Sequence, residues 1–162
     1  MRVFFDTEFL EDGKTIDLIS IGLVREDGEE LYMVSEEFSW ARAEADPWIN
    51  DNVLAYIPRD FPRFPRDHIA CVIEDFLFGE EPEFWAYYAD YDWIALCQLY
   101  GRMIDLPKGW PKFCRDLKQY AEERNIVVLP KQLGVEHHAL ADANWVKEAF
   151  DFCNEQRKVV IQ

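Results

Sequence analysis

Residues 2–9 read Arg-Val-Phe-Phe-Asp-Thr-Glu-Phe, and the expected fold is built around this stretch. It begins with an apolar, β-favouring run and ends in two carboxylates, Asp6 and Glu8, that are separated by one residue. Alternate side chains of a strand share a face, so Phe4 would point with the two acids and Phe5 would point the other way. The acids would lie roughly 6.5–7 Å apart along the backbone. That separation lets two carboxylates hold a hard divalent cation or a neighbouring pair of cations.

A strand that runs into an acidic turn is the plain alternative for the same stretch. Glu11 and Asp12 follow directly, and acidic residues are common in turns. Residues 2–12 alone leave both interpretations open.

The composition predicts one globular domain that spans residues 1–162. With 49% hydrophobic and 15% aromatic residues, the chain can bury about two thirds of its unfolded surface. No stretch has the apolar length of a membrane span, and the apolar run after Arg2 is too short for a signal peptide. The four cysteines are widely spaced and form no Cys-x-x-Cys pair, which argues against a zinc site or a disulfide framework. We therefore expect reduced thiols and a cytoplasmic location.

The formal net charge of −15 argues against a protein that binds nucleic acid through a basic patch. Divalent cations held in a carboxylate cluster would reverse the sign of the charge locally, where a phosphodiester would sit. The acidic balance is therefore compatible with a metal-dependent enzyme that acts on phosphate esters.

The order of predicted elements indicates a mixed α/β sheet of five strands flanked by helices. Residues 16–24 and 30–34 read as strands joined by a turn at 26–29, so the chain opens with an antiparallel meander. Residues 36–65 are less regular, with a short helix expected from Asp46-Pro47 to Leu54. The remaining pattern predicts helices at 66–78, 91–100, 116–125 and 139–156, and short strands at 84–88 and near 113–114.

Asp92 and Asp142 are two further carboxylates that fall on the apolar faces of predicted helices. The helical positions on the same face are apolar or aromatic. They are Ala95, Leu96, Leu99 and Tyr100 for Asp92, and Val146, Ala149, Phe150 and Cys153 for Asp142. An ionised group on such a face must be paired, protonated or bound to a metal. A helix N-cap is the alternative for Asp92, and it fits Asp142 less well because that residue lies inside its helical run.

His137 precedes Asp142 by five residues, near the start of the last helix. A neutral imidazole at this position can accept a proton from a metal-bound water. A surface or capping histidine is the alternative, for His137 and for His138 alike. His68 has no acidic companion pattern.

Three motifs, taken in order, resemble those of the DEDDh 3′-to-5′ exonucleases. They are Asp6-x-Glu8, Tyr91-Asp92 and His137-x4-Asp142. The stretches DPWINDNVL (46–54), WAYYADYD (85–92) and EHHALAD (136–142) are similar to the RNase AS group of polyadenylate-specific 3′-exoribonucleases, and the likeness covers nearly the whole chain. One departure is Tyr88, since many DEDDh enzymes have asparagine four residues before the second-motif aspartate.

The resemblance implies a ribonuclease H-like fold and a site for two metal ions, expected to be Mg²⁺, with Mn²⁺ able to replace it. Asp6, Glu8, Asp92 and Asp142 would hold the ions, and His137 would take a proton from the attacking water. The implied reaction releases 5′-nucleoside monophosphates from the 3′ end of single-stranded RNA. The expected preference for poly(A) comes from the resemblance alone.

Three residues beside these acids are expected to contact substrate. Phe9 follows Glu8 at the strand end, where stacking on a terminal base would be worth roughly 1–3 kcal/mol. Thr7 and Trp93 are the other two, although a core position is the default for any single aromatic residue of this chain. By analogy we also expect a homodimer, with the aromatic-rich stretch 40–64 covering a partner surface.

Two competing interpretations stay open on sequence grounds. An oligoribonuclease or a DNA-trimming enzyme would use the same chemistry on another substrate. A catalytically silent acidic domain that binds calcium or a protein partner would leave His137 unexplained, because calcium prefers oxygen ligands.

Overall fold

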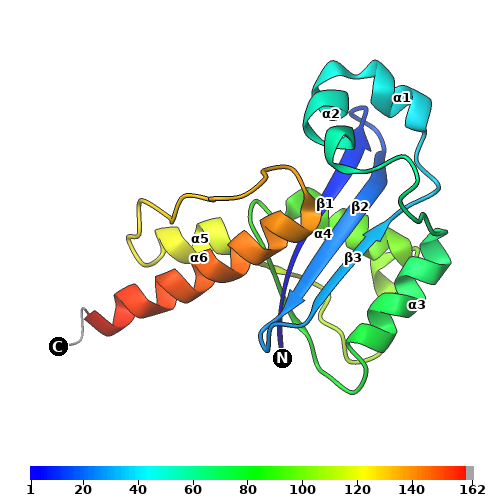
Figure 1. The fold of residues 1–162 in the computed structure, drawn as a ribbon. Coiled ribbons are helices and arrows are strands. Elements are labelled where there is room, and N and C mark those ends of the chain that lie inside the picture. Colours follow the sequence, from blue (N-terminus) through cyan, green and yellow to red (C-terminus); the bar gives the residue numbers. More distant parts are fainter. Residues whose placement is uncertain (160–162) are drawn as a thin grey trace.

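The stretch that contains Asp6 and Glu8 forms a strand, β1, as predicted, and this strand lies at the centre of the sheet. The computed structural model describes the backbone of residues 1–159 and the side chains of residues 1–156. It contains a five-stranded sheet of order β3-β2-β1-β4-β5 (Figure 1). The strands are β1 (Arg2–Glu11), β2 (Ile16–Arg25), β3 (Glu30–Val34), β4 (Glu83–Ala86) and β5 (Arg115–Asp116). β1, β2 and β3 are antiparallel and β4 and β5 run parallel to β1, so the predicted mixed α/β sheet is confirmed.

The helices agree with the predicted order, with one addition and some shifted ends. They are α1 (Trp40–Ala45), α2 (Pro47–Asn52), α3 (Arg66–Phe76), α4 (Asp90–Leu99), α5 (Leu117–Glu122) and α6 (Ala139–Val159), with short 3₁₀ turns at Leu54–Tyr56 and Met103–Asp105. α1 was not predicted, and the fourth strand ends two residues earlier than expected. The fifth strand begins at Arg115, just after the predicted position.

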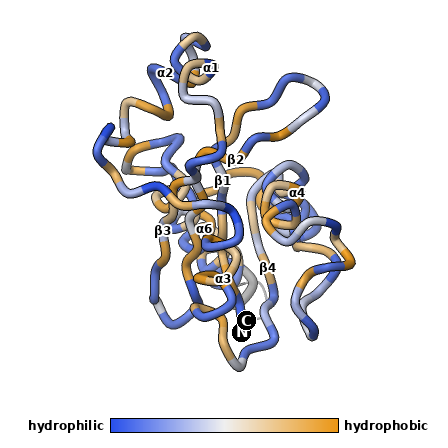
Figure 2. The backbone as a smooth tube through the Cα atoms, turned by 90° about the vertical axis from the view of Figure 1, so that its right-hand side faces the viewer, coloured by the Kyte–Doolittle hydropathy of each residue, from blue (hydrophilic) through white to orange (hydrophobic). Residues whose placement is uncertain are grey.

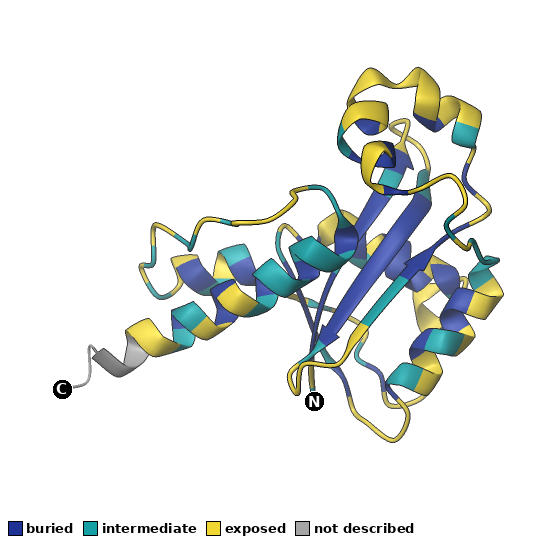
Figure 3. Cartoon of the chain, in the orientation of Figure 1, coloured by how far each residue is buried: buried dark blue, intermediate teal, exposed yellow. Residues whose placement is uncertain are grey.

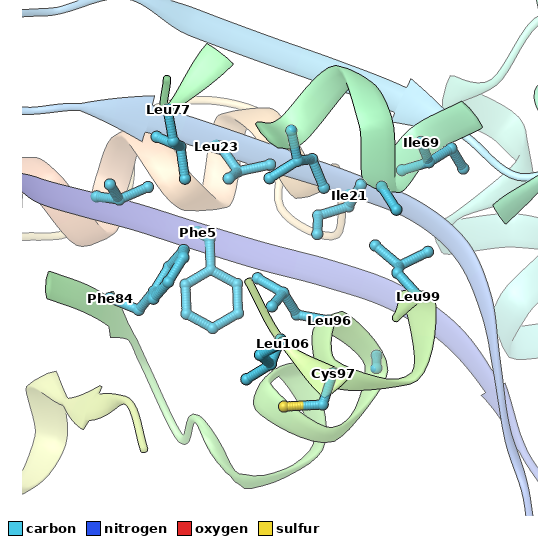
Figure 4. Close-up of a cluster of buried hydrophobic side chains, with 14 of the residues drawn as sticks. Phe5, Ile21, Leu23, Ile69, Leu77, Phe84, Leu96, Cys97, Leu99 and Leu106 are labelled. Carbon is cyan, nitrogen blue, oxygen red and sulfur yellow. The ribbon is translucent and has the colours of Figure 1, made fainter. Parts of the chain in front are cut away.

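The alternation predicted for β1 is confirmed, because its two faces enter two different cores. Phe5 joins Ile21, Leu23 and Phe84 in the cluster that faces α3 and α4 (Figure 4). Phe4 lies on the opposite face, where its ring is 5.2 Å from that of Phe150 in α6. The middle strands are consequently buried along most of their length (Figure 3).

Gly22 of β2 allows α6 to approach the sheet closely. It pairs with Asp6 across the strands, and a Cβ atom at this position would lie 2.4 Å from the carbonyl oxygen of Ala139. Any side chain here would therefore displace the first turn of α6. Because Asp142 lies in that turn, Gly22 is what lets this acid reach the β1 carboxylates.

α1 and α2 form a small layer above the ends of β1 and β2, far from the two termini (Figure 2). The α2 start follows the predicted chemistry, since Pro47 is the first helical residue and the Asp46 carboxylate accepts from the N–H groups of Trp48 and Ile49 at 2.9 and 3.1 Å. Ile49 packs with Leu10 in a third apolar cluster. This packing places Trp48 over the end of β1.

No helix in residues 1–159 is long and apolar enough to cross a membrane.

Candidate active site

The predicted acids and His137 line one pocket of about 570 Å³ at the end of β1. Asp6 and Glu8 come from β1, Asp92 from the first turn of α4, and Asp142 from the first turn of α6. The pocket lies where β1 extends beyond β4: the last β1–β4 pair is Phe4 with Trp85, and β4 ends one residue later, at Ala86. Among the described residues, no strand pairs with the rest of β1 on this side. The structure thus brings together residues that are up to 136 positions apart.

Asp92 is bound to β1 through Thr7. The Thr7 N–H and hydroxyl groups both donate to Oδ1 of Asp92, at 2.9 and 2.6 Å. The N-cap alternative for Asp92 is wrong, since Ala89 is the N-cap residue of α4 and no side chain caps the helix. Burial raises the pKa of Asp92 to about 6, against the two Thr7 hydrogen bonds, which lower it.

Asp142 is held by two donors that lie before α6. The Gln132 side chain donates to Oδ1, and the His138 N–H donates to Oδ2 at 3.1 Å. Sequence reasoning missed Gln132, which lies in a loop without a periodic pattern. Burial raises the pKa of Asp142 above its ordinary value, and these hydrogen bonds lower it in part.

The two β1 acids are strongly destabilised as anions. Burial, followed by the charges of Asp92, Glu8 and Asp142, raises the pKa of Asp6 well above its ordinary value. Burial and the charges of Asp142 and Asp92 raise the pKa of Glu8 to about 8. In the part of the chain that the structure describes, none of the four acids forms a salt bridge with Lys, Arg or His. Such a cluster must either hold protons or hold cations.

The donor set fits a hard divalent cation. Four carboxylates converge on one pocket, and ligand atoms of Glu8, His137 and Asp142 lie within 4.8 Å of one another. Oxygen ligands are those that Mg²⁺ and Ca²⁺ prefer. His137 is thus near enough to the acids to act either as a base or as a metal ligand.

His137 has an unusual backbone conformation and an aromatic neighbour. Its φ is +62°, in the left-handed region that non-glycine residues adopt at a cost of roughly 1–2 kcal/mol. Its ring makes an edge-to-face contact with that of Trp48, with ring centroids 4.7 Å apart. Trp48 was not predicted as a site residue, although it lies in one of the stretches that carried the resemblance.

The structure places two of the three expected substrate contacts, Phe9 and Thr7, in the pocket and leaves Trp93 outside it. Phe9 lines the pocket and stacks on Tyr91, with centroids 5.7 Å apart and the rings 12° from parallel. Thr7 also lines the pocket, but its hydroxyl is engaged with Asp92. Trp93 packs against Phe84, 5.5 Å away, and the structure does not bring it into the pocket.

Tyr88, which stands where many DEDDh enzymes have asparagine, is one of the residues that line the pocket. It is 62% exposed and has a φ of +54°, at the turn by which the chain leaves β4 for α4.

Comparison with known proteins places the chain in a family. The family model for the 3′-5′ exoribonuclease Rv2179c-like domain matches residues 1–154. The 3′-5′ exoribonuclease Rv2179c of Mycobacterium tuberculosis strain H37Rv is 44% identical over 148 residues, which is 88% of this chain and 87% of that protein. The 3′-5′ exoribonuclease MT2234.1 of strain CDC 1551 is similar to the same extent. With the pocket of acids described above, these similarities lead to one conclusion: the chain belongs to the Rv2179c-like family of 3′-5′ exoribonucleases.

Proposed function

We propose that the chain is a metal-dependent DEDDh 3′-to-5′ exoribonuclease with a two-metal site. The observation that carries this proposal is that four carboxylates from β1, α4 and α6 converge on one pocket, whose described lining residues include no Lys or Arg. Like charges at such close quarters are costly unless metal ions offset them.

Asp6, Glu8, Asp92 and Asp142 would hold the ions, and Mg²⁺, replaceable by Mn²⁺, suits their oxygen atoms. When bound, the ions supply charge for the scissile phosphate and lower the pKa of the attacking water. Neighbouring residues of the protein hold these carboxylates in position. Thr7 keeps Asp92 in place, and the loop before α6 does the same for Asp142 through Gln132 and His138.

His137 is proposed as the general base. It reaches the pocket beside Glu8 and Asp142, where it would take the proton of the attacking water. Its edge-to-face contact with Trp48 would restrict the rotation of the imidazole.

The proposed substrate is the 3′ end of single-stranded RNA, released as 5′-monophosphates. Phe9, stacked on Tyr91, offers an aromatic surface to one terminal base. Stacking is sequence-tolerant, so it does not select adenine. The proposed preference for poly(A) is supported by the resemblance to the RNase AS group.

We also propose that the protein is a homodimer and that it acts in the cytoplasm. Of the stretch 40–64, Trp48 and Tyr56 are 51% and 45% exposed, whereas Trp40 packs in the third cluster beneath the Arg63 guanidinium. Light scattering at micromolar concentration should give the mass of a dimer. A monomeric mass would refute this part alone.

The test of the function is a digestion of 5′-labelled RNA. In Mg²⁺ the labelled RNA should give a ladder of products, each one nucleotide shorter than the last. EDTA should stop the reaction. A 3′-phosphate should block the reaction. Endonucleolytic fragments, or full activity in EDTA, would overturn the proposal. Digestion of A, U, C and G homopolymers side by side tests the preference for poly(A). Equal rates on all four would refute this preference but not the exonuclease activity.

A further inference from the structure

Two hollows meet at the carboxylates. The aromatic hollow is the pocket described above, walled by Phe9, Trp48 and Tyr91. The second, which we name the lysine hollow, has a volume of about 410 Å³ and is walled by Pro130, Lys131, Trp145 and others. Asp6, Tyr87, His137 and Asp142 line both, so the reacting centre lies between them.

Lys131 is the one Lys or Arg among the described residues that line these two hollows. It is exposed and has no ion-pair partner in residues 1–156, whereas most other basic side chains of that range are paired with an acid. The other charged group specific to the lysine hollow is Glu136, which is exposed. A surface lysine in solvent is the ordinary explanation of such a side chain, and its place beside the reacting centre is what sets it apart.

The walls around Lys131 are suited to a nucleotide. The Trp145 ring is fixed by a hydrogen bond from its Nε1–H to the Pro130 carbonyl oxygen at 2.9 Å, and its edge meets Tyr87 with centroids 5.0 Å apart. Rigid aromatic walls beside one free cation match a base or ribose followed by a phosphate.

We infer that Lys131 binds the phosphate on the 5′ side of the penultimate nucleotide, an inference that rests on the proposed function. The scissile phosphate belongs at the four acids. If the terminal nucleotide occupies the aromatic hollow, the penultimate nucleotide enters the lysine hollow, and its 5′-phosphate is the next negative charge along the chain.

The surface beyond the lysine hollow limits this contact to one phosphate. An adjoining hollow along α6 is lined by Glu148, Asp151 and Glu155, and its one described lysine, Lys147, is paired with Asp151 at 2.8 Å. That acidic surface repels further phosphates, so among the described residues of this path Lys131 is the cation available to the substrate.

The test compares adenylyl-adenosine with and without a 5′-phosphate, in Mg²⁺. Wild-type protein should cleave the phosphorylated dinucleotide with a KM about tenfold lower, the order of one charge-assisted contact. Lys131→Gln should abolish this difference and leave kcat unchanged. Lys108→Gln removes the same charge at an exposed position outside both hollows and should keep the difference.

A second readout uses a long oligoadenylate at several salt concentrations. Loss of one phosphate contact should reduce the slope of log(kcat/KM) against log salt by about 0.7 in Lys131→Gln. An unchanged slope, or a phosphate preference that survives in Lys131→Gln, overturns the inference. If wild-type protein cleaves neither the dinucleotides nor the oligoadenylate in Mg²⁺, the proposed exoribonuclease function itself is refuted. This outcome differs from one in which the protein is active but Lys131 has no effect.

Discussion

Thr7 donates two hydrogen bonds to Oδ1 of Asp92, a residue that lies 85 positions further along the chain. The Thr7 hydroxyl is 2.6 Å from this oxygen and the Thr7 backbone N–H group is 2.9 Å from it. This contact joins β1 to the first turn of α4. It therefore fixes the distance between two parts of the carboxylate cluster.

Replacing Thr7 tests this relationship. Thr7→Val keeps the shape but removes the hydroxyl donor, so Asp92 would lose a hydrogen bond worth about 1.5–3 kcal/mol to a charged group. We expect kcat/KM to fall by about tenfold or more. Thr7→Ser keeps the donor and should retain most of the activity. Equal activity of the valine and serine variants would show that the hydroxyl does not position Asp92.

Neutralising a single acid should abolish turnover and leave the fold intact. Asp6→Asn or Asp142→Asn removes charge from the proposed metal site with little change in shape. The matched control is Asp90→Asn, because Asp90 lies in the same turn of α4 as Asp92 but is exposed and does not line the pocket. Near-normal hydrolysis by Asp6→Asn in Mg²⁺, with an unchanged circular dichroism spectrum, would contradict the site assignment.

His137→Ala should lower the rate by about 10²–10⁴, the usual contribution of a positioned general base. Metal binding, measured by calorimetry, should survive if His137 acts as a base. Loss of metal binding would make it a ligand beside Glu8 and Asp142, a role that the geometry also permits.

His138→Ala is the control for this variant. The His138 ring stacks on Tyr32, with centroids 4.5 Å apart, so its loss should affect stability more than chemistry. If this variant is the inactive one, the motif has been read in the wrong register.

Without metal, the folded protein should lose stability as pH rises from about 5 to 8. The pKa of Glu8 is about 8 in the folded state and ordinarily 4.5, so in this range the folded state holds a proton that the unfolded state has released. Stability then falls with rising pH, by up to about 1.4 kcal/mol per pH unit for one such proton. Urea unfolding in EDTA should show this slope, and Glu8→Gln should reduce it.

Bound Mg²⁺ should flatten the same profile, because carboxylates bind metal in the deprotonated form. A wild-type profile in EDTA that matches that of Glu8→Gln at every pH would show that Glu8 is ordinarily ionised in the folded protein.

Local sequence alone determined the parts of this protein that depend on neighbouring residues. The period-two pattern of β1 determines which of its side chains share a face, and Asp46-Pro47 determines where α2 begins, because strand geometry and helix capping act over a few residues. The three acidic motifs could be located for the same reason, since each is a short pattern on a predicted strand or helix.

Tertiary structure decided which side chains meet. No local pattern shows that the Thr7 hydroxyl is engaged with Asp92, that Gln132 holds Asp142, or that Trp93 packs in the core, because each depends on how distant elements pack. Lys131 lies in a loop without periodicity, and only the fold places it beside the acids. The closeness of the four acids also belongs to the fold, because it requires β4 to end early and Gly22 to admit α6.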